Sequence, residues 1–167
     1  MKRTLAVVFT TILVALLVIP ATTALADQNF HPTLKIPISL TSEPGDHTLR
    51  NGWHMRRHAE GPVNYLIESY MLNGALPDTR YDICVELPGY EGIYFVVDYV
   101  GFDYCIQTDR NGNGQLLARY SPDPFYFPPG GSMTWRWVFI SGGTPSGGIM
   151  VGGTAAFETD FFTVYFD

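Results

Sequence analysis

The chain has 167 residues, of which 46% are hydrophobic and 14% aromatic, with a formal net charge of −6 and two cysteines. This length is sufficient for one domain with a substantial core. The acidic balance argues against nucleic acid and anionic membranes as partners, because both carry negative charge themselves.

Residues 1–26 have the pattern of a secretory signal peptide. Lys2 and Arg3 form a basic start, a short apolar run follows, and Ala24-Leu25-Ala26 supplies an A-x-A cleavage signal. The apolar run is shorter than the about 20 residues that span a bilayer, so we expect cleavage and no stable membrane anchor afterwards. Cleavage removes two of the ten Lys and Arg residues and none of the sixteen Asp and Glu residues. This leaves residues 27–167 as a single domain of net charge about −8, which we expect to be secreted, extracellular or periplasmic.

The first half of this domain alternates apolar and polar residues, which is typical of half-buried strands. Residues 33–40 form the first such segment. Pro37 places it at a sheet edge or at a gap in a ladder, because proline has no amide hydrogen to donate. Asn51-Gly52 predicts a tight turn. Residues 63–70 predict a further strand with its odd-numbered residues on the apolar face, and Asn73-Gly74 predicts the next turn.

Residues 76–87 predict a corner followed by a strand. In the strand, Tyr81 and Ile83 belong to an apolar face that alternates with polar residues. The pattern L-P-x-T-x-Y-x-I-x-V resembles the corner of fibronectin-III and immunoglobulin-like β-sandwiches, where a tyrosine bonds to backbone a few residues upstream. The resemblance covers about a dozen residues. It implies an extracellular scaffold or binding role, and a bond from the Tyr81 phenol to backbone near Gly74 or Leu76.

Cys84 and Cys105 predict a disulfide, since both lie in the exported part of the chain. Two buried thiols are the alternative. Each cysteine shares a strand face with polar neighbours, so we expect the bond to join neighbouring strands outside the core. A disulfide needs Cα atoms about 4.4–6.8 Å apart. Either the bond is absent, therefore, or the apolar run at 93–100 leaves the sheet between the two cysteine-bearing strands, and we favour the second.

The second half predicts further strands and connections: a hairpin turn at 107–115, its returning strand at 116–120, a proline-aromatic loop at 120–129, a core strand at 133–139, a flexible glycine-rich excursion at 141–153 and terminal strands at 155–166. In the core strand, Trp135 and Trp137 share the apolar face. No stretch of the domain has a helical repeat of any length. We therefore predict an all-β fold, an immunoglobulin-like Greek-key β-sandwich of about nine strands.

One stretch resembles part of a calcium site. Asp109-x-Asn111-x-Asn113-Gly114 matches the first half of an EF-hand loop. That loop also needs a carboxylate at its twelfth position, and Tyr120 occupies it here. Asn and Gly tolerate positive φ, so a β-turn is the preferred interpretation and Asp109, Asn111 and Asn113 are weak metal candidates.

A basic cluster at 47–58 contains the other candidates. On a strand, His54 and His58 share a face but lie about 13 Å apart, too far to share one ion, and neighbouring arginines repel a cation. A structural role, with the cluster pairing to acidic groups, is one interpretation. Another is that Arg56 or Arg57 holds an anion or a carboxylate-bearing ligand.

The sequence contains no nucleophile elbow and no recognisable catalytic constellation. The proline-aromatic loop, with Phe125 and Tyr126, is a candidate surface for a protein or glycan partner; packing of its rings against the core is the alternative. We predict a secreted, non-catalytic binding or structural module that uses loops at one end and needs no cofactor. The alternative is an extracellular enzyme or metal-binding protein that uses His54 and His58.

Overall fold

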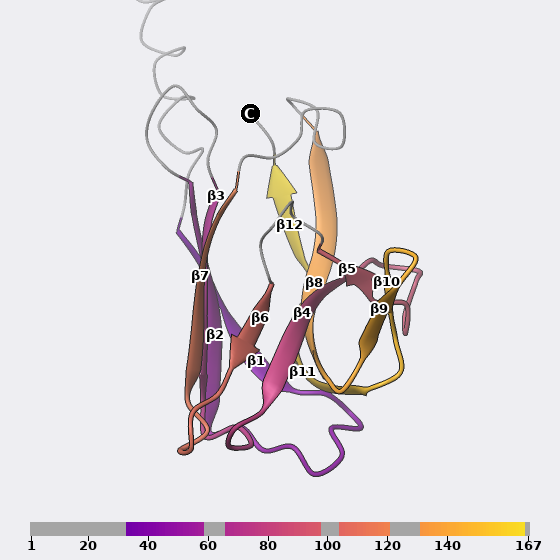
Figure 1. Cartoon of the computed structure of the whole chain (residues 1–167). Coiled ribbons are helices and arrows are strands. Elements are labelled where there is room, and N and C mark those ends of the chain that lie inside the picture. The colour runs from indigo at the N-terminus through magenta and orange to yellow at the C-terminus, as the bar shows by residue number, and fades with distance from the viewer. Residues whose placement is uncertain (1–32, 59–65, 98–103, 121–130, 166–167) are drawn as a thin grey trace, which may run out of the picture. The chain divides into compact units, whose positions relative to one another are not determined.

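A computed structural model describes residues 33–58, 66–97, 104–120 and 131–165, all within one compact unit, 33–167 (Figure 1). The predicted signal peptide, 1–26, lies outside these residues, as do Phe125 and Tyr126. The described residues form twelve strands and contain no helix that could cross a membrane. The strands are β1 (Leu34–Leu40), β2 (Asn51–His58), β3 (Leu66–Asn73), β4 (Arg80–Glu86), β5 (Phe95–Val96), β6 (Cys105–Gln107), β7 (Gly114–Tyr120), β8 (Ser132–Ser141), β9 (Thr144–Ser146), β10 (Ile149–Val151), β11 (Thr154–Thr159) and β12 (Phe162–Tyr165).

All strand pairs are antiparallel, in the order β7-β3-β2-β1-β11-β8-β4-β5-β10-β9, with β12 added to β8 and β6 added to β4. Strand β1 joins the two parts of this curled sheet, because it changes partner along its length. Its first half, Leu34 to Pro37, pairs with β2, and its second half, Ile38 to Leu40, pairs with β11. Pro37 is the last β1 residue paired with β2, opposite Trp53, and the β11 ladder begins at the next residue, so the proline lies where β1 changes partner.

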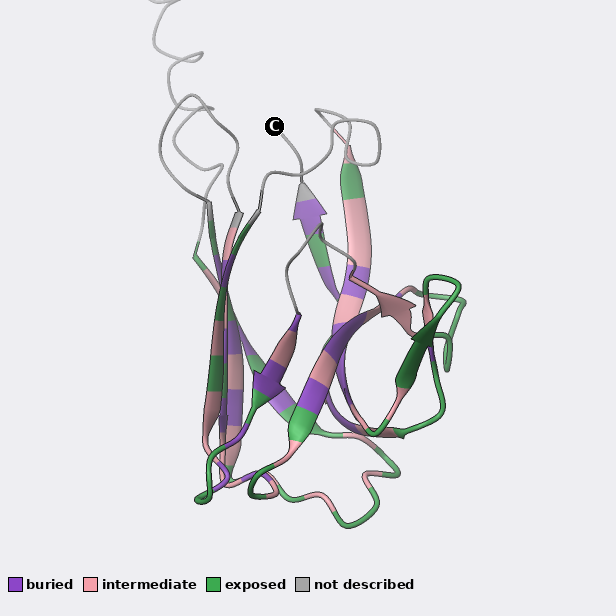
Figure 2. Ribbon diagram, in the orientation of Figure 1, coloured by how far each residue is buried: buried purple, intermediate pink, exposed green. Residues whose placement is uncertain are grey.

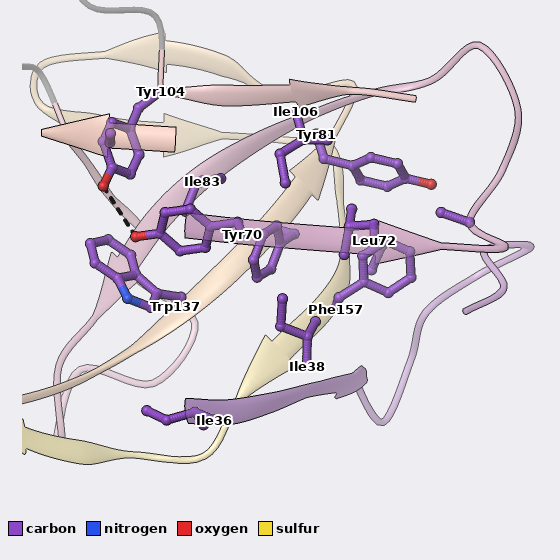
Figure 3. Packing of buried hydrophobic residues seen from close by; sticks show 14 of the residues in the cluster. Ile36, Ile38, Tyr70, Leu72, Tyr81, Ile83, Tyr104, Ile106, Trp137 and Phe157 are labelled. Atoms are coloured by element: carbon purple, nitrogen blue, oxygen red, sulfur yellow. Dashed lines mark hydrogen bonds between the residues drawn. The ribbon is translucent and has the colours of Figure 1, made fainter. Parts of the chain in front are cut away.

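The main core lies between the β1-β2-β3-β7 part of the sheet and the part formed by β11, β8, β4 and β6 (Figures 1 and 3). Alternation explains why these strands form. Ile36 and Ile38 of β1 are buried, whereas the residues between and beside them are exposed (Figure 2). Tyr81 and Ile83 of β4 belong to the same core, as do Trp137 and its neighbours on β8. These inward faces were predicted correctly.

The predicted turn at Asn51-Gly52 is wrong, because both residues lie in β2, opposite Asn73 and Leu72 of β3. Gly52 is needed for packing instead. A Cβ there would come within 3.1 Å of the Ile38 Cβ and 3.0 Å of a backbone oxygen of β3. The turn prediction failed because glycine marks close approach of backbones as well as turns.

The glycine-rich stretch at 141–153, predicted to be a flexible excursion, contains the β9–β10 hairpin. Ser146 pairs with Ile149, and between them Gly147 and Gly148 both have positive φ (58° and 83°). Two such residues make the two-residue turn whose twist suits a hairpin. This hairpin, together with β2 where a turn was expected, raises the strand number above the predicted nine. The ladders also form one continuous curled sheet. This sheet confirms the predicted all-β class but does not establish the predicted immunoglobulin-like sandwich.

The tyrosine corner is present as a local interaction. Tyr81 is fully buried, its phenol oxygen lies 2.9 Å from His47 Nδ1, and the Leu76 backbone partly opposes the effect of burial on the pKa of the phenol. Burial raises the pKa of the Tyr81 phenol, which stays neutral and able to donate. The corner therefore ties the start of β4 to the turn before it.

The predicted disulfide is absent: Cys84 and Cys105 are not bonded to each other. Their strands are direct neighbours as expected, and β5 pairs with β4 further along the same edge instead of lying between β4 and β6. However, Cys105 lies opposite Asp82, which makes its relation to Cys84 diagonal. Diagonal positions on neighbouring strands are about 7–8 Å apart, more than a disulfide spans. Cys84 instead packs in a second cluster with Val138 and Met150.

Alkylation tests this arrangement. In denaturant without reductant, both thiols should react, and intact mass should increase by two adducts. In the native protein Cys84 should react slowly, because burial and the nearby Asp82 raise the pKa of its thiol to about 12. Cys84→Ala identifies the slow site. A mass that changes only after reduction would show that the disulfide forms.

Candidate functional site

Charged side chains gather on the buried face of β2 and β3, where an ordinary sheet would carry apolar residues. His54 and Glu68 are 0% exposed and Arg56 is 6% exposed. Arg56 lies directly opposite Glu68 in the ladder, and His54 lies opposite Tyr70. Local register therefore brings an acid, a base and a phenol together inside the core.

The Glu68 carboxylate is the centre of this group, which we call the interior cluster: His54, Arg56, Glu68, Tyr70 and Tyr104. Glu68 Oε1 lies 3.7 Å from His54 Nε2 and 3.9 Å from Arg56 Nε. Glu68 Oε2 accepts hydrogen bonds from the phenols of Tyr70 and, at 3.0 Å, Tyr104. The two phenol oxygens are 3.1 Å apart, as the dashed line in Figure 3 marks. Tyr104 immediately precedes β6, so the cluster links both sides of the curled sheet.

The electrostatics keep Glu68 ionised. Burial alone would raise the pKa of this carboxyl, because it disfavours the charged form. The neighbouring His54 and Arg56 and the hydrogen bond from the Tyr70 phenol together outweigh burial, so the pKa of Glu68 is lowered. A buried carboxylate thus has an arginine, a histidine and two phenols around it.

Several buried nitrogen atoms around the cluster have no hydrogen-bond partner among the described residues: both ring nitrogens of His54, Nη1 of Arg56, and the indole nitrogens of Trp135 and Trp137. Each buried polar group left without a partner costs about 1–3 kcal/mol. Native proteins avoid this by supplying water or a ligand. These nitrogen atoms are therefore where a water molecule or a ligand would be expected to bond.

Aromatic rings pack around these nitrogen atoms. The His54 ring stacks on Tyr70, with centroids 4.8 Å apart and planes at 18°. Trp137 approaches His54 edge-on, with centroids 5.9 Å apart, and the Arg56 guanidinium carbon lies 5.5 Å from the Trp135 ring centroid. Figure 3 shows Trp137 beneath the Tyr70–Tyr104 pair. Donors on an aromatic wall suit a planar, acceptor-bearing group.

A second charged group shows what a completed network looks like. Arg136 donates to Glu86 from Nε, and its Nη1 lies 2.9 Å from Glu158. The remaining Glu86 oxygen accepts from the Gly92 amide at 2.6 Å. Both carboxylates and the guanidinium are therefore paired within the chain. This group, which we call the Arg136 clamp, is a structural network on the far side of β4 and β8. The interior cluster differs because several of its nitrogen atoms have no partner among the described residues.

The candidate residues from the sequence separate in the structure. Arg56 and His54 belong to the interior cluster, whereas Arg57 is exposed on the opposite face of β2. His58 is the last residue of β2. Among the described residues, no group of three His, Cys, Asp or Glu side chains could hold a metal ion.

The Asp109 stretch forms a turn. Asp109 Oδ1 accepts from the amides of Asn111 and Asn113, at 2.8 and 2.9 Å. These bonds, that of Asn113 first, lower the pKa of the exposed Asp109 carboxyl. The Gly112 carbonyl accepts from the Ala75 amide at 3.0 Å, and a Cβ on Gly112 would come within 2.0 Å of the Ala75 oxygen. The preferred β-turn interpretation accounts for these residues.

Sequence reasoning missed Glu68, Tyr70 and Tyr104 as members of one site. The alternation at 63–70 placed odd-numbered residues inward, but Glu68 and Tyr70 are the buried ones and Met71 is 40% exposed. Because Glu68 and Tyr70 are polar but point inward, the alternation of apolar and polar residues indicated the wrong face. A usable signal was His54-x-Arg56, two basic residues at strand spacing that need an acid opposite them.

No family model, curated protein or solved structure matches this chain. The site is therefore interpreted from its own geometry.

Replacing Glu68 tests the balance of charges. Glu68→Gln keeps the shape but leaves Arg56 and His54 without their counter-charge. We expect it to lower the free energy of unfolding by about 3 kcal/mol. The matched control is Asp82→Asn, which breaks the surface pair with Arg80 (2.7 Å) and should cost at most about 1 kcal/mol. Equal effects in urea denaturation would contradict the central role of Glu68.

The pH dependence of stability follows from the same carboxylate. Because the pKa of Glu68 is lowered in the folded state, its contribution is full above its unfolded pKa of about 4.3. It is lost as pH falls through the folded pKa. Chemical denaturation between pH 3 and 7 should therefore show an acid-side loss that is smaller in Glu68→Gln. Glu158→Gln should keep that loss, since burial raises the pKa of Glu158. An unchanged profile in Glu68→Gln would contradict the assignment.

Proposed function

We propose that this protein is an exported, non-catalytic binding module whose interior cluster takes a small carboxylate-bearing molecule. The observation that carries the proposal is the set of buried nitrogen atoms on His54, Arg56, Trp135 and Trp137 that have no hydrogen-bond partner in the part of the chain that the structure describes. An acceptor-rich ligand would satisfy them together. A purely structural network would be expected to resemble the Arg136 clamp, in which every charged group is paired.

The ligand class follows from charge and shape. Glu68 offsets one cation of the cluster, so an incoming carboxylate meets a site that is neutral or positive, according to the protonation of His54. The guanidinium of Arg56 has Nε directed to Glu68 and Nη1 without a partner. An arginine donates in a planar fork that matches a carboxylate. The surrounding rings favour a flat, aromatic acid over a bulky one.

The chemistry of the cluster favours binding over catalysis. A general base works best with a pKa near the operating pH, but the pKa of Glu68 is shifted downwards and two phenols already bond one of its oxygens. Cys84 is equally unsuited as a nucleophile, with a buried thiol of pKa about 12. These features argue against both a proton-transfer role and a thiolate mechanism.

The tyrosine corner supports an immunoglobulin-like scaffold by resemblance, and such scaffolds commonly present binding loops. Recognition of a protein or glycan partner by Phe125 and Tyr126 remains a prediction. An enzyme or metal protein using His54 and His58 is the second candidate. His54 lies beside the Glu68 carboxylate, and a histidine with a carboxylate is a common pair of metal ligands. However, Arg56 lies 3.9 Å from that same carboxylate oxygen and disfavours a cation.

Benzoate serves as the probe, with neutral benzamide as its isosteric control. Calorimetry should show benzoate binding to the native protein and at least about tenfold weaker binding to Arg56→Met, since hydrogen bonds to charged groups contribute about 1.5–3 kcal/mol. Arg57→Met, one residue away on the outer side of β2, should bind like the native protein. Trp137→Phe removes one donor while keeping a ring, and it should also weaken binding. This variant serves as the test if Arg56→Met fails to fold.

Equal binding of benzoate and benzamide, or no binding of either, would contradict the proposal. Zinc binding lost in His54→Gln would favour the metal alternative. Hydrolysis of model esters that the same substitution abolishes would favour the enzyme.

A further inference from the structure

The face of β1, β2, β3 and β7 that points away from the core carries apolar side chains in neighbouring rows. Trp53 pairs across the ladders with Pro37 on one side and Met71 on the other. Met55 and Leu117 lie in the next row, on either side of the small Ser69. Met55, Met71 and Leu117 are 41%, 40% and 60% exposed. Contiguous exposed apolar side chains mark interaction sites, unlike single ones. We call this surface the outer face.

Basic residues border the outer face. Arg57 and Arg119 lie in one row, both paired with Ile67, and Lys35 lies opposite Met55. The Lys35 ammonium is 4.0 Å from the Trp53 ring centroid, a cation–π contact. None of the outward positions on these four strands is Asp or Glu, although the whole chain carries a net charge of −6. The outer face is thus a positive, apolar surface on an acidic protein.

We propose that the outer face docks an acidic protein segment in which apolar side chains alternate with carboxylates. Methionine, tryptophan and arginine are enriched at protein interfaces, and methionine adapts to irregular partners. Complementary charge raises the association rate and selects the partner. An alternating segment places its apolar side chains on one side and its carboxylates toward the basic rim. This surface is separate from the interior cluster, so neither proposal depends on the other.

Two other occupants fit the face less well. A second copy in a symmetric contact would bring Arg57 and Arg119 against like charges, which is unfavourable. An anionic bilayer matches the charge, but it requires apolar groups that reach past the basic ones. Lysine and arginine side chains are longer than those of Leu117 and Met71.

The test uses a synthetic peptide of about twelve residues that alternates Leu and Glu, which is long enough to cross the four strands at about 4.8 Å per strand. We expect saturable binding by fluorescence anisotropy that weakens with salt and is at least about tenfold weaker in Arg57→Glu/Arg119→Glu. The matched control, Arg50→Glu/Arg110→Glu, makes the same charge change at exposed turn positions and should bind like the native protein. Circular dichroism verifies folding.

A second pair of variants tests the apolar part. Leu117→Ser should weaken peptide binding, whereas Val151→Ser, at an exposed position of β10, should not. Absence of peptide binding, equal binding of a Leu–Lys peptide, or equal loss in both arginine pairs would overturn the proposal. So would co-sedimentation with phosphatidylglycerol vesicles without peptide binding, or a dimer that Leu117→Ser dissociates.

Discussion

The buried carboxylate of Glu68 is the constraint on which the interior of this protein depends. A carboxylate in a core is strongly unfavourable unless it is paired and hydrogen-bonded. Here His54 and Arg56 come from β2 and the phenols from β3 and from Tyr104 before β6. Satisfying one charge therefore requires two parts of the curled sheet to meet at a defined distance. Trp137 packs against this meeting point and transmits the constraint to β8.

The protein contains two buried or half-buried charged networks that differ in how completely they are paired, the Arg136 clamp and the interior cluster. The Arg136 clamp is complete within the chain, because both carboxylates are paired to the guanidinium. In the interior cluster the carboxylate has hydrogen-bond partners, whereas several buried nitrogen atoms have none among the described residues. This asymmetry is the physical basis for assigning a ligand to the second and a structural role to the first. Aromatic walls around the surplus donors reinforce the assignment, since they exclude water and strengthen a hydrogen bond made there.

Sheet geometry also separates the interior cluster from the outer face. Successive side chains of a strand leave on opposite faces, so Arg56 enters the core while Arg57 points to solvent. Two neighbouring arginines thus serve two different surfaces. β2 and β3 carry both of these surfaces, and the curl set by β1 gives each strand an inside and an outside.

The sequence by itself determined the all-β class, the inward faces of β1, β4 and β8, the Tyr81 corner and the Asp109 turn, because each depends on local periodicity or turn chemistry. It also marked Arg56 and His54 as unusual. Only the tertiary structure decided that Glu68 is their partner, that Gly52 serves packing, that Cys84 and Cys105 are diagonal, and that Gly147-Gly148 close a hairpin. Those outcomes depend on register and on which strands become neighbours, and one-dimensional alternation does not specify either when a charge occupies an inward position.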